Sequence, residues 1–189
     1  DLAPVSLVAS GPLVLVAHPS VAANTVTEFI AYARANPDKL VYGSSGIGTI
    51  NHLATLLFLQ ANGLSALHVP YKGAAPAVID VLSGQIQMTF SNTVTSGVHL
   101  KSGRLRGLAI TSPRRGQIFP GMPTVAESGV PGFELSNSYA YFAPAGTPRG
   151  IIRAINAVVS QGMNSPETSR LLNADGSEPI PPATPEAFK

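Results

Sequence analysis

A strand, a tight turn and the start of a helix are predicted in the stretch Val41-Tyr42-Gly43-Ser44-Ser45-Gly46-Ile47-Gly48-Thr49-Ile50-Asn51-His52-Leu53. The residues Leu40 to Tyr42 have the aliphatic and aromatic side chains of a buried strand end. Gly43, Gly46 and Gly48 allow the backbone to take positive φ angles and to approach a ligand closely. The spacing therefore predicts a glycine-rich turn at the end of a buried strand.

The helix after this turn is predicted from Ile50 to Gln60, with Thr49 as its N-cap, because apolar residues recur there at helical spacing. The turn would then lie at a helix N-terminus, where free N–H groups and the positive end of the dipole favour an anion. Ser44 and Ser45 add hydroxyl donors that can orient a carboxylate or a phosphate. The alternative is an ordinary β–α turn that packs and binds nothing.

Composition narrows the class of protein. The chain has 189 residues, of which 44% are hydrophobic and 12% charged, which is enough for one good core or two small lobes. The net charge of +2 is too small and too scattered to predict nucleic-acid binding. No run approaches the ~18 consecutive apolar residues of a transmembrane helix. Cysteine is absent, which excludes disulfides, thiolate metal sites and cysteine nucleophiles.

Strands and helices alternate through the first two thirds of the chain. A capping box at Thr25 and Glu28 predicts a helix through Ala35. Short turns then separate further predicted strands (66–70, 85–90 and 105–111) and helices (74–82 and 93–101). Before them, two short strands are expected at 5–8 and 13–16, divided by Ser10-Gly11-Pro12. This alternation predicts an α/β fold with a mostly parallel sheet.

The pattern becomes less regular after Thr111. A second capping-box spacing, Thr124 with Glu127, predicts a short helix that ends at Ser128-Gly129. An extended segment is expected at 133–142, followed by an amphipathic helix at 151–163 and a second helix near Pro166. The last residues, 184–188, have the pattern of a helix start.

Three predicted strand ends carry small or polar residues: Gly43 to Thr49, Tyr71 to Gly73, and Ser91-Asn92. In an open parallel sheet, ligands bind outside the carboxyl ends of the strands, so these turns are expected to line one cleft. They offer amide, hydroxyl and ammonium donors and no carboxylate, which suits a small anionic ligand. Alternatives stay open for Lys72 as a solvated turn residue, Tyr71 as a packing aromatic, and Ser91 and Asn92 as a helix cap.

Catalytic motifs match poorly. The turn lacks the lysine of a P-loop and of an S-x-x-K motif, and Asn51 stands where the dinucleotide-binding pattern needs its last glycine. The four histidines show no metal-ligand spacing, so no metal and no cofactor are expected. His52 lies one turn into the helix, where it can reach a ligand or make a structural hydrogen bond. An enzyme alternative, an α/β hydrolase or transferase with Ser44 or Ser45 as nucleophile, lacks a predicted acid–histidine pair.

Several motifs together resemble the tripartite tricarboxylate transporter substrate-binding proteins, the TctC or Bug family. They follow in the family's order over nearly the whole chain: Gly43-Ser44-Ser45-Gly46-Ile47-Gly48 with His52-Leu53, His68-Val69-Pro70-Tyr71-Lys72-Gly73 with Pro76-Ala77, Gly103-Arg104-Leu105-Arg106, Pro123-Thr124-Val125-Ala126-Glu127-Ser128-Gly129, and Ala143-Pro144-Ala145-Gly146-Thr147-Pro148.

The resemblance implies a periplasmic receptor of the type II, venus-flytrap fold, not an enzyme, which delivers a small carboxylate to a membrane permease without itself entering the membrane. Residues 10–138 would form the second, ligand-binding lobe, and 1–9 with 139–189 a crossover and the C-terminal part of the first lobe, whose remainder is expected to be missing. The implied ligand-binding residues are Ser44, Ser45, Gly46, Gly48, Thr49, Tyr71, Lys72, Gly73, Ser91 and Asn92.

One departure from the family bears on the ligand. Family members often carry an acidic residue in the turn after the strand that ends at Phe90, where this chain has Ser91-Asn92. A receptor for an amino-acid ammonium group needs that acid. Its replacement therefore favours a plain dicarboxylate or an aromatic acid.

Overall fold

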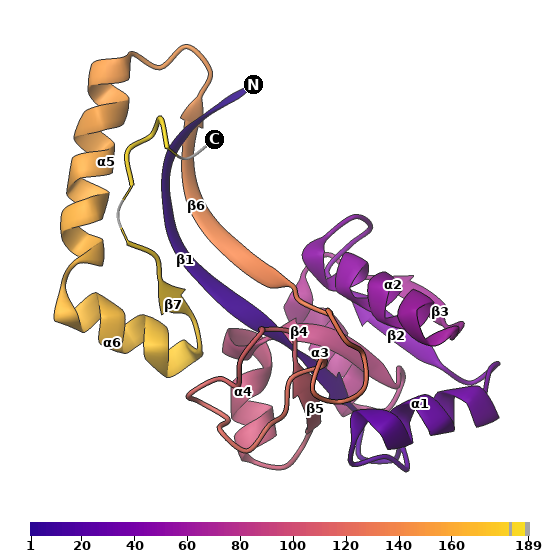
Figure 1. Ribbon diagram of the computed structural model, residues 1–189. Coiled ribbons are helices and arrows are strands. Elements are labelled where there is room, and N and C mark those ends of the chain that lie inside the picture. Colours follow the sequence, from indigo (N-terminus) through magenta and orange to yellow (C-terminus); the bar gives the residue numbers. More distant parts are fainter. Residues whose placement is uncertain (182, 188–189) are drawn as a thin grey trace. The chain divides into compact units, whose positions relative to one another are not determined.

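The computed structural model describes residues 1–181 and 183–187, and its contacts divide the chain into two compact units (Figure 1). One unit comprises residues 12–136, and the other comprises 1–11 with 137–189. The strand β1 (Leu2–Ala17) contributes residues to both units. Each unit is described by itself below.

The larger unit is built on a five-stranded sheet with the order β3-β2-β4-β1-β5. Its other strands are β2 (Val41–Ser44), β3 (Leu67–Pro70), β4 (Met88–Asn92) and β5 (Arg106–Ile110). β2 runs parallel to both β3 and β4, whereas β1 is antiparallel to β4 and β5. Four strands therefore point the same way and β1 points the other way, which confirms an α/β fold with a mostly parallel sheet.

Helices cover both faces of this sheet. The helices are α1 (Val26–Ala35), α2 (Ile50–Asn62), α3 (Ala74–Leu82) and α4 (Thr93–Lys101). Leu13, Leu15 and Ala17 of β1 pack in one core with α1 and α2, while Val14 and Val16 pack in a second core with α3. Because successive side chains of a strand point to opposite faces, the unbroken apolar run of β1 is buried on both sides.

β1 is one continuous strand, so the expectation of two strands at 5–8 and 13–16 was wrong. Ser10 still pairs with Glu178 of β7 (Glu178–Pro179), and Leu13 already pairs with Asn92 of β4. Gly11 and Pro12 lie between these two ladders. The chain stays extended through Pro12, within the single strand β1.

Two other local expectations differ from the structure. Thr124 and Glu127 do exchange the two hydrogen bonds of a capping box, at 2.9 and 3.0 Å, yet only a turn forms. Gly129, with φ of +102°, ends that turn before a helix can propagate. β4 begins at Met88 rather than Gln85, because the amides of Gln85 and Ile86 bond to the Asp80 carbonyl at the end of α3.

The smaller unit contains the first part of β1, paired with β6 (Ser136–Pro144) and β7, and the helices α5 (Arg149–Met163) and α6 (Pro166–Asp175). Val5, Ala143 and Ile152 form its buried cluster. The helix start predicted at 184–188 is a turn at 184–187, where the Ala187 amide bonds to Thr184, and its last residue lies outside the described residues.

Candidate functional site

The three turns singled out in the sequence lie at one edge of the sheet in the larger unit. They follow β2, β3 and β4, which are neighbours and run parallel, so their carboxyl ends point to the same edge. The Tyr71 amide donates to the Ser44 carbonyl at 3.0 Å and joins the first two turns. α2, α3 and α4 all begin at this edge, since each directly follows one of these strands.

The loop 44–49 is folded around the carbonyl of Gly46. That oxygen accepts hydrogen bonds from the Ser44 hydroxyl at 3.1 Å and the Thr49 hydroxyl at 2.7 Å. Gly46 and Gly48 have φ angles of +135° and +78°, as predicted, which other residues rarely adopt. Thr49 is the N-cap of α2 by its backbone, but its hydroxyl bonds to Gly46 and caps no helix amide.

The reason expected for Gly43 was wrong. Its φ angle is not positive, and glycine is required there by space instead. A Cβ atom at this position would lie 2.6 Å from Cδ1 of Ile86, 3.1 Å from Cε2 of Tyr71 and 3.2 Å from Cβ of Ala77. Gly43 therefore allows α3 and the Tyr71 ring to pack directly on β2.

A relay of side chains ties the loop to β4. The Ser45 hydroxyl donates to Oδ1 of Asn51 at 2.6 Å, and Nδ2 of Asn51 donates to the Phe90 carbonyl at 2.7 Å. Asn51 is buried, so its amide has found both partners inside the protein. The relay links the turn after β2 with the end of β4, next to Ser91.

Two histidines, His52 and His68, form hydrogen bonds with the loop 44–49. His68, on β3, lies 2.7 Å from the Ser44 hydroxyl through Nε2, and the Gly48 amide donates to Nδ1 of His52 at 3.1 Å. The two imidazole rings stack with centroids 4.2 Å apart, and Tyr42 stacks on His68 at 4.7 Å. Burial lowers the pKa of His68, and the neighbouring His52 lowers it further.

The second turn combines an engaged tyrosine with an exposed lysine. The Tyr71 hydroxyl donates to Oδ2 of Asp80 at 2.6 Å, and burial together with this bond raises the pKa of Tyr71 to about 12. Lys72 is exposed, and Gly73, with φ of +130°, leads into α3. The Tyr71 hydroxyl therefore holds the turn to α3, while Lys72 is accessible to a ligand.

The third turn, Ser91-Asn92, provides the N-cap of α4. Oδ1 of Asn92 accepts from the Thr95 amide at 2.9 Å, so Asn92 is the N-cap of α4. Ser91 is buried, and its hydroxyl donates to the Asn92 carbonyl at 3.2 Å. Both residues lie at the predicted edge, and the capping alternative considered for Asn92 is correct.

Sequence reasoning missed the supporting residues Asn51, His68 and Asp80. A period-2 pattern in 67–70, read in register with 41–44, would have placed His68 beside Tyr42. No local pattern indicates the contacts of Asn51 and Asp80. Asn51 donates to the Phe90 carbonyl, 39 residues later in the sequence, and Asp80 accepts from the Tyr71 hydroxyl, nine residues earlier.

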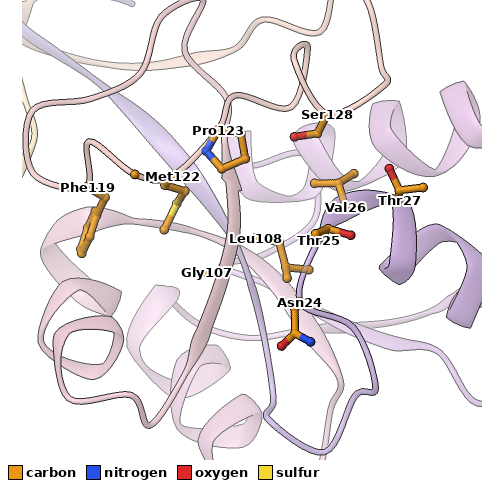
Figure 2. A pocket seen from close by; sticks show the side chains of 11 residues that line it. Asn24, Thr25, Val26, Thr27, Gly107, Leu108, Phe119, Met122, Pro123 and Ser128 are labelled. Atoms are coloured by element: carbon orange, nitrogen blue, oxygen red, sulfur yellow. The ribbon is translucent and has the colours of Figure 1, made fainter.

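A cavity of about 580 Å³ lies elsewhere in the same unit, between the start of α1 and the segment 119–123 (Figure 2). Its lining includes Gly107 of β5, which pairs with Val16 near the end of antiparallel β1, so the cavity lies toward the opposite edge of the sheet. The lining residues that the structure describes include no charged side chain. The hydroxyl of Thr25, which also lines it, already accepts from the Glu28 amide in the cap of α1.

Residues 1–181 and 183–187 contain neither a metal-binding cluster nor a membrane-spanning helix. No three His, Asp or Glu side chains in these ranges group closely enough to hold a metal ion. No helix in them is both long and apolar enough to pass through a lipid bilayer.

The mixed sheet with helices on both faces is the fold of the periplasmic binding proteins, the class that structural comparison gives. The structure of the periplasmic binding protein BugD superposes with a TM-score of 0.94 and is 31% identical, covering 99% of this chain and 63% of that one. Residues 1–188 match the family model described as tripartite tricarboxylate transporter family receptor, TctC, and the chain belongs to this family.

Two other similar solved structures contain a small dicarboxylate. R. palustris Rpa4515 with adipate has a TM-score of 0.95 and 35% identity, covering 100% of this chain and 62% of that one. MatC from Rhodopseudomonas palustris with bound malate has a TM-score of 0.89 and 28% identity, covering 94% and 60%. The chain spans about half the length of the curated relatives it matches, 53% and 57% in two cases.

The chain belongs to a family of binding proteins, so it is not the α/β hydrolase or transferase considered as the alternative. The structure does bring Ser44 within 2.7 Å of His68, the pairing that a serine nucleophile needs. Ser44 is fully buried, however, and its hydroxyl donates to the Gly46 carbonyl. It therefore serves the loop's own structure and cannot reach a substrate.

Proposed function

We propose that the protein is a periplasmic solute-binding receptor for a small dicarboxylate, which it delivers to the membrane permease of a tripartite tricarboxylate-type carrier. The observation that carries the proposal is the convergence of three donor-rich turns and the N-termini of α2, α3 and α4 at one edge of the sheet. Aligned amide dipoles at helix N-termini favour an anion at that edge. The family and its periplasmic members support the location and the partner.

The proposed contacts divide into two groups. Ser45, Gly46, Gly48, Thr49, Lys72, Gly73 and Asn92 are proposed to face the ligand, and Ser44, Tyr71 and Ser91 to hold the turns in place. In the second group, Ser44 and Ser91 are buried and the Tyr71 hydroxyl is bonded to Asp80. In the first, Lys72 is exposed and supplies an ammonium group that can pair with a carboxylate.

Ser45 is the informative member of the first group. Its single hydroxyl proton now goes to Asn51, and a carboxylate, as a stronger acceptor, can take that proton's bond after a rotation about Cβ–Oγ. A small dicarboxylate is favoured because related structures contain adipate and malate, and because Ser91-Asn92 supply no acid for an ammonium group.

Amide NMR of the ¹⁵N-labelled chain, titrated with adipate and separately with the uncharged adipamide, tests the proposal. We expect adipate to shift the amides of 44–49, 71–73 and 91–92, and adipamide, which has the same carbon chain, to shift none. Shifts that cluster around the cavity near α1, or equal effects of both compounds, would overturn the placement of the site.

The same titration with Ser45→Ala measures the hydroxyl. Loss of a hydrogen bond to a charged group costs about 1.5–3 kcal/mol, so affinity should fall roughly tenfold to a hundredfold. Ser65→Ala is the matched control, because Ser65 is exposed and precedes β3 at the other end of that strand. Equal affinity of both variants and the unmodified protein would remove Ser45 from the site.

A further inference from the structure

The two histidines beneath the loop hold both of its ends. His68 reaches Ser44 at the beginning of the loop, and His52 reaches Gly48 near its end. Between these two points lie Ser45 and Gly46, which the proposed function places against the ligand.

The hydrogen bonds require a lone pair on one ring nitrogen of His52. Nδ1 of His52 accepts from the Gly48 amide, so that nitrogen carries no proton. The Ser44 hydroxyl lies 3.1 Å from the Gly46 carbonyl and 2.7 Å from Nε2 of His68, and it accepts from the Gly46 amide. Nε2 of His68 donates to Ser44 in one tautomer and accepts from it in the other.

The surroundings also favour neutral rings. The imidazoles stack face to face, with planes 11° apart and centroids separated by 4.2 Å, an arrangement that two positive charges would oppose. From β2, Tyr42 stacks on His68, whereas Tyr71 and its partner Asp80 pack with α3 on the other face of the sheet. The lowered pKa of His68 agrees with this geometry.

We propose that the stacked pair His52 and His68 positions the loop 44–49 for its ligand, and that the loop binds a carboxylate well only while the pair is neutral. The inference rests on the proposed function. Protonation of Nδ1 in His52 places two donors, that nitrogen and the Gly48 amide, against each other. Gly48 is then released, and the loop loses the conformation that Gly46 and Gly48 hold at positive φ.

Two substitutions at His52 separate the loss of its hydrogen bond with Gly48 from the effect of adding a proton to the ring. His52→Asn places a carbonyl oxygen near the position of Nδ1 and cannot take up a proton in this range, whereas His52→Leu removes the acceptor. His68→Gln keeps an N–H donor in the place of Nε2. Adipate affinity, corrected for the protonation of adipate itself, and amide spectra are measured for each protein between pH 8 and pH 5.5.

For the unmodified protein we expect the Gly48 amide resonance to move as the pH is lowered, and adipate affinity to fall with it. His52→Asn should bind with nearly constant affinity across the range. His52→Leu should bind about tenfold more weakly at every pH, the effect of one lost hydrogen bond. Affinity that rises on acidification would overturn the proposal, because it would make imidazolium a direct partner of the carboxylate.

The amide spectra distinguish two kinds of failure. If Gly48 follows His52 but adipate and malate bind at no pH, the proposed function fails for these acids and the support of the loop by the pair stands. If Gly48 is insensitive both to pH and to His52→Leu, the pair does not position the loop, whatever the ligand affinity.

Discussion

The carbonyl of Gly46 shows how single residues build the candidate site. It accepts the hydroxyls of Ser44 and Thr49, which come from the two ends of the loop. The protein itself holds a loop closed in this way in one conformation, before the ligand proposed for it binds. Preorganisation of this kind reduces the ordering cost of association, which otherwise subtracts from affinity.

Gly43 is the residue whose substitution should damage the fold most simply. In Gly43→Ala the new methyl group would lie 2.6 Å from Ile86 and 3.2 Å from Ala77. We expect the free energy of unfolding to fall by about 1–3 kcal/mol, the usual cost of overpacking. Urea unfolding measures it, with Gly121→Ala as the control, since a Cβ there meets nothing within 4 Å. Equal stability of the two variants would contradict the packing argument.

Tyr71→Phe tests whether that hydroxyl is structural. The variant loses the bond to Asp80, and we expect a loss of about 1 kcal/mol in unfolding free energy with adipate affinity unchanged. In the unmodified protein, absorbance at alkaline pH should include a component from Tyr71 that ionises near pH 12, and this component should vanish in the variant. A large loss of adipate affinity with normal stability would place the hydroxyl on the ligand instead.

At the scale of whole elements, the helices that start at the binding edge also depend on the residues proposed for the ligand. Asn92 caps α4 through its side chain, whereas α2 and α3 begin at Thr49 and Gly73 without a side-chain cap. No side chain at these N-caps accepts from the first amides of α2 and α3, so those amides can donate to another acceptor. An anion at this edge can bond to amides that the fold itself does not use for capping.

Two substitutions at Asn92 separate its two roles. Aspartate caps helices as well as asparagine, so Asn92→Asp should leave stability unchanged while its negative charge lowers adipate affinity by at least about tenfold. Asn92→Ala should instead lose about 1 kcal/mol of stability, because the Thr95 amide loses its partner. Thermal unfolding and adipate titration check both. Unchanged affinity in the aspartate variant would place Asn92 away from the ligand.

At the scale of the whole molecule, the titration of His68 couples stability to pH. Its pKa in the folded protein lies below the ordinary value of 6.5, so the unfolded chain binds the proton more tightly. The stability associated with neutral His68 is fully present above about pH 6.5 and is lost as the pH falls through the lower, folded pKa.

We therefore expect the midpoint of urea unfolding to fall between pH 7.5 and pH 5.5, and His68→Gln to reduce this fall. His99→Gln is the control, because His99 lies in the last turn of α4, away from the histidine stack. If the two variants show the same pH dependence as the unmodified protein, burial of His68 does not govern the acid limb of stability.

Local features of this protein follow from the sequence alone. The capping bond between Thr25 and Glu28, the start of α2 at Ile50 after Thr49, and the full span of α3 appear as predicted. Such features depend on side chains and backbone groups within about four residues of each other, so a linear pattern contains all the interacting partners. The family motifs likewise lie in the sequence itself, and through them the fold and the class of binding protein could be predicted.

Only the tertiary structure decides how those pieces share their polar groups. The sequence suggests that Ser44, Ser45 and Tyr71 offer hydroxyl donors, and the structure shows these donors bonded to Gly46, Asn51 and Asp80. His68 contacts the Ser44 hydroxyl although the two residues are 24 positions apart in the sequence. β1 pairs with β7 before Gly11 and with β4 after Pro12, and it remains one strand. Whether a donor is available depends on which acceptor the folded chain brings near it, and those acceptors belong to other strands and helices.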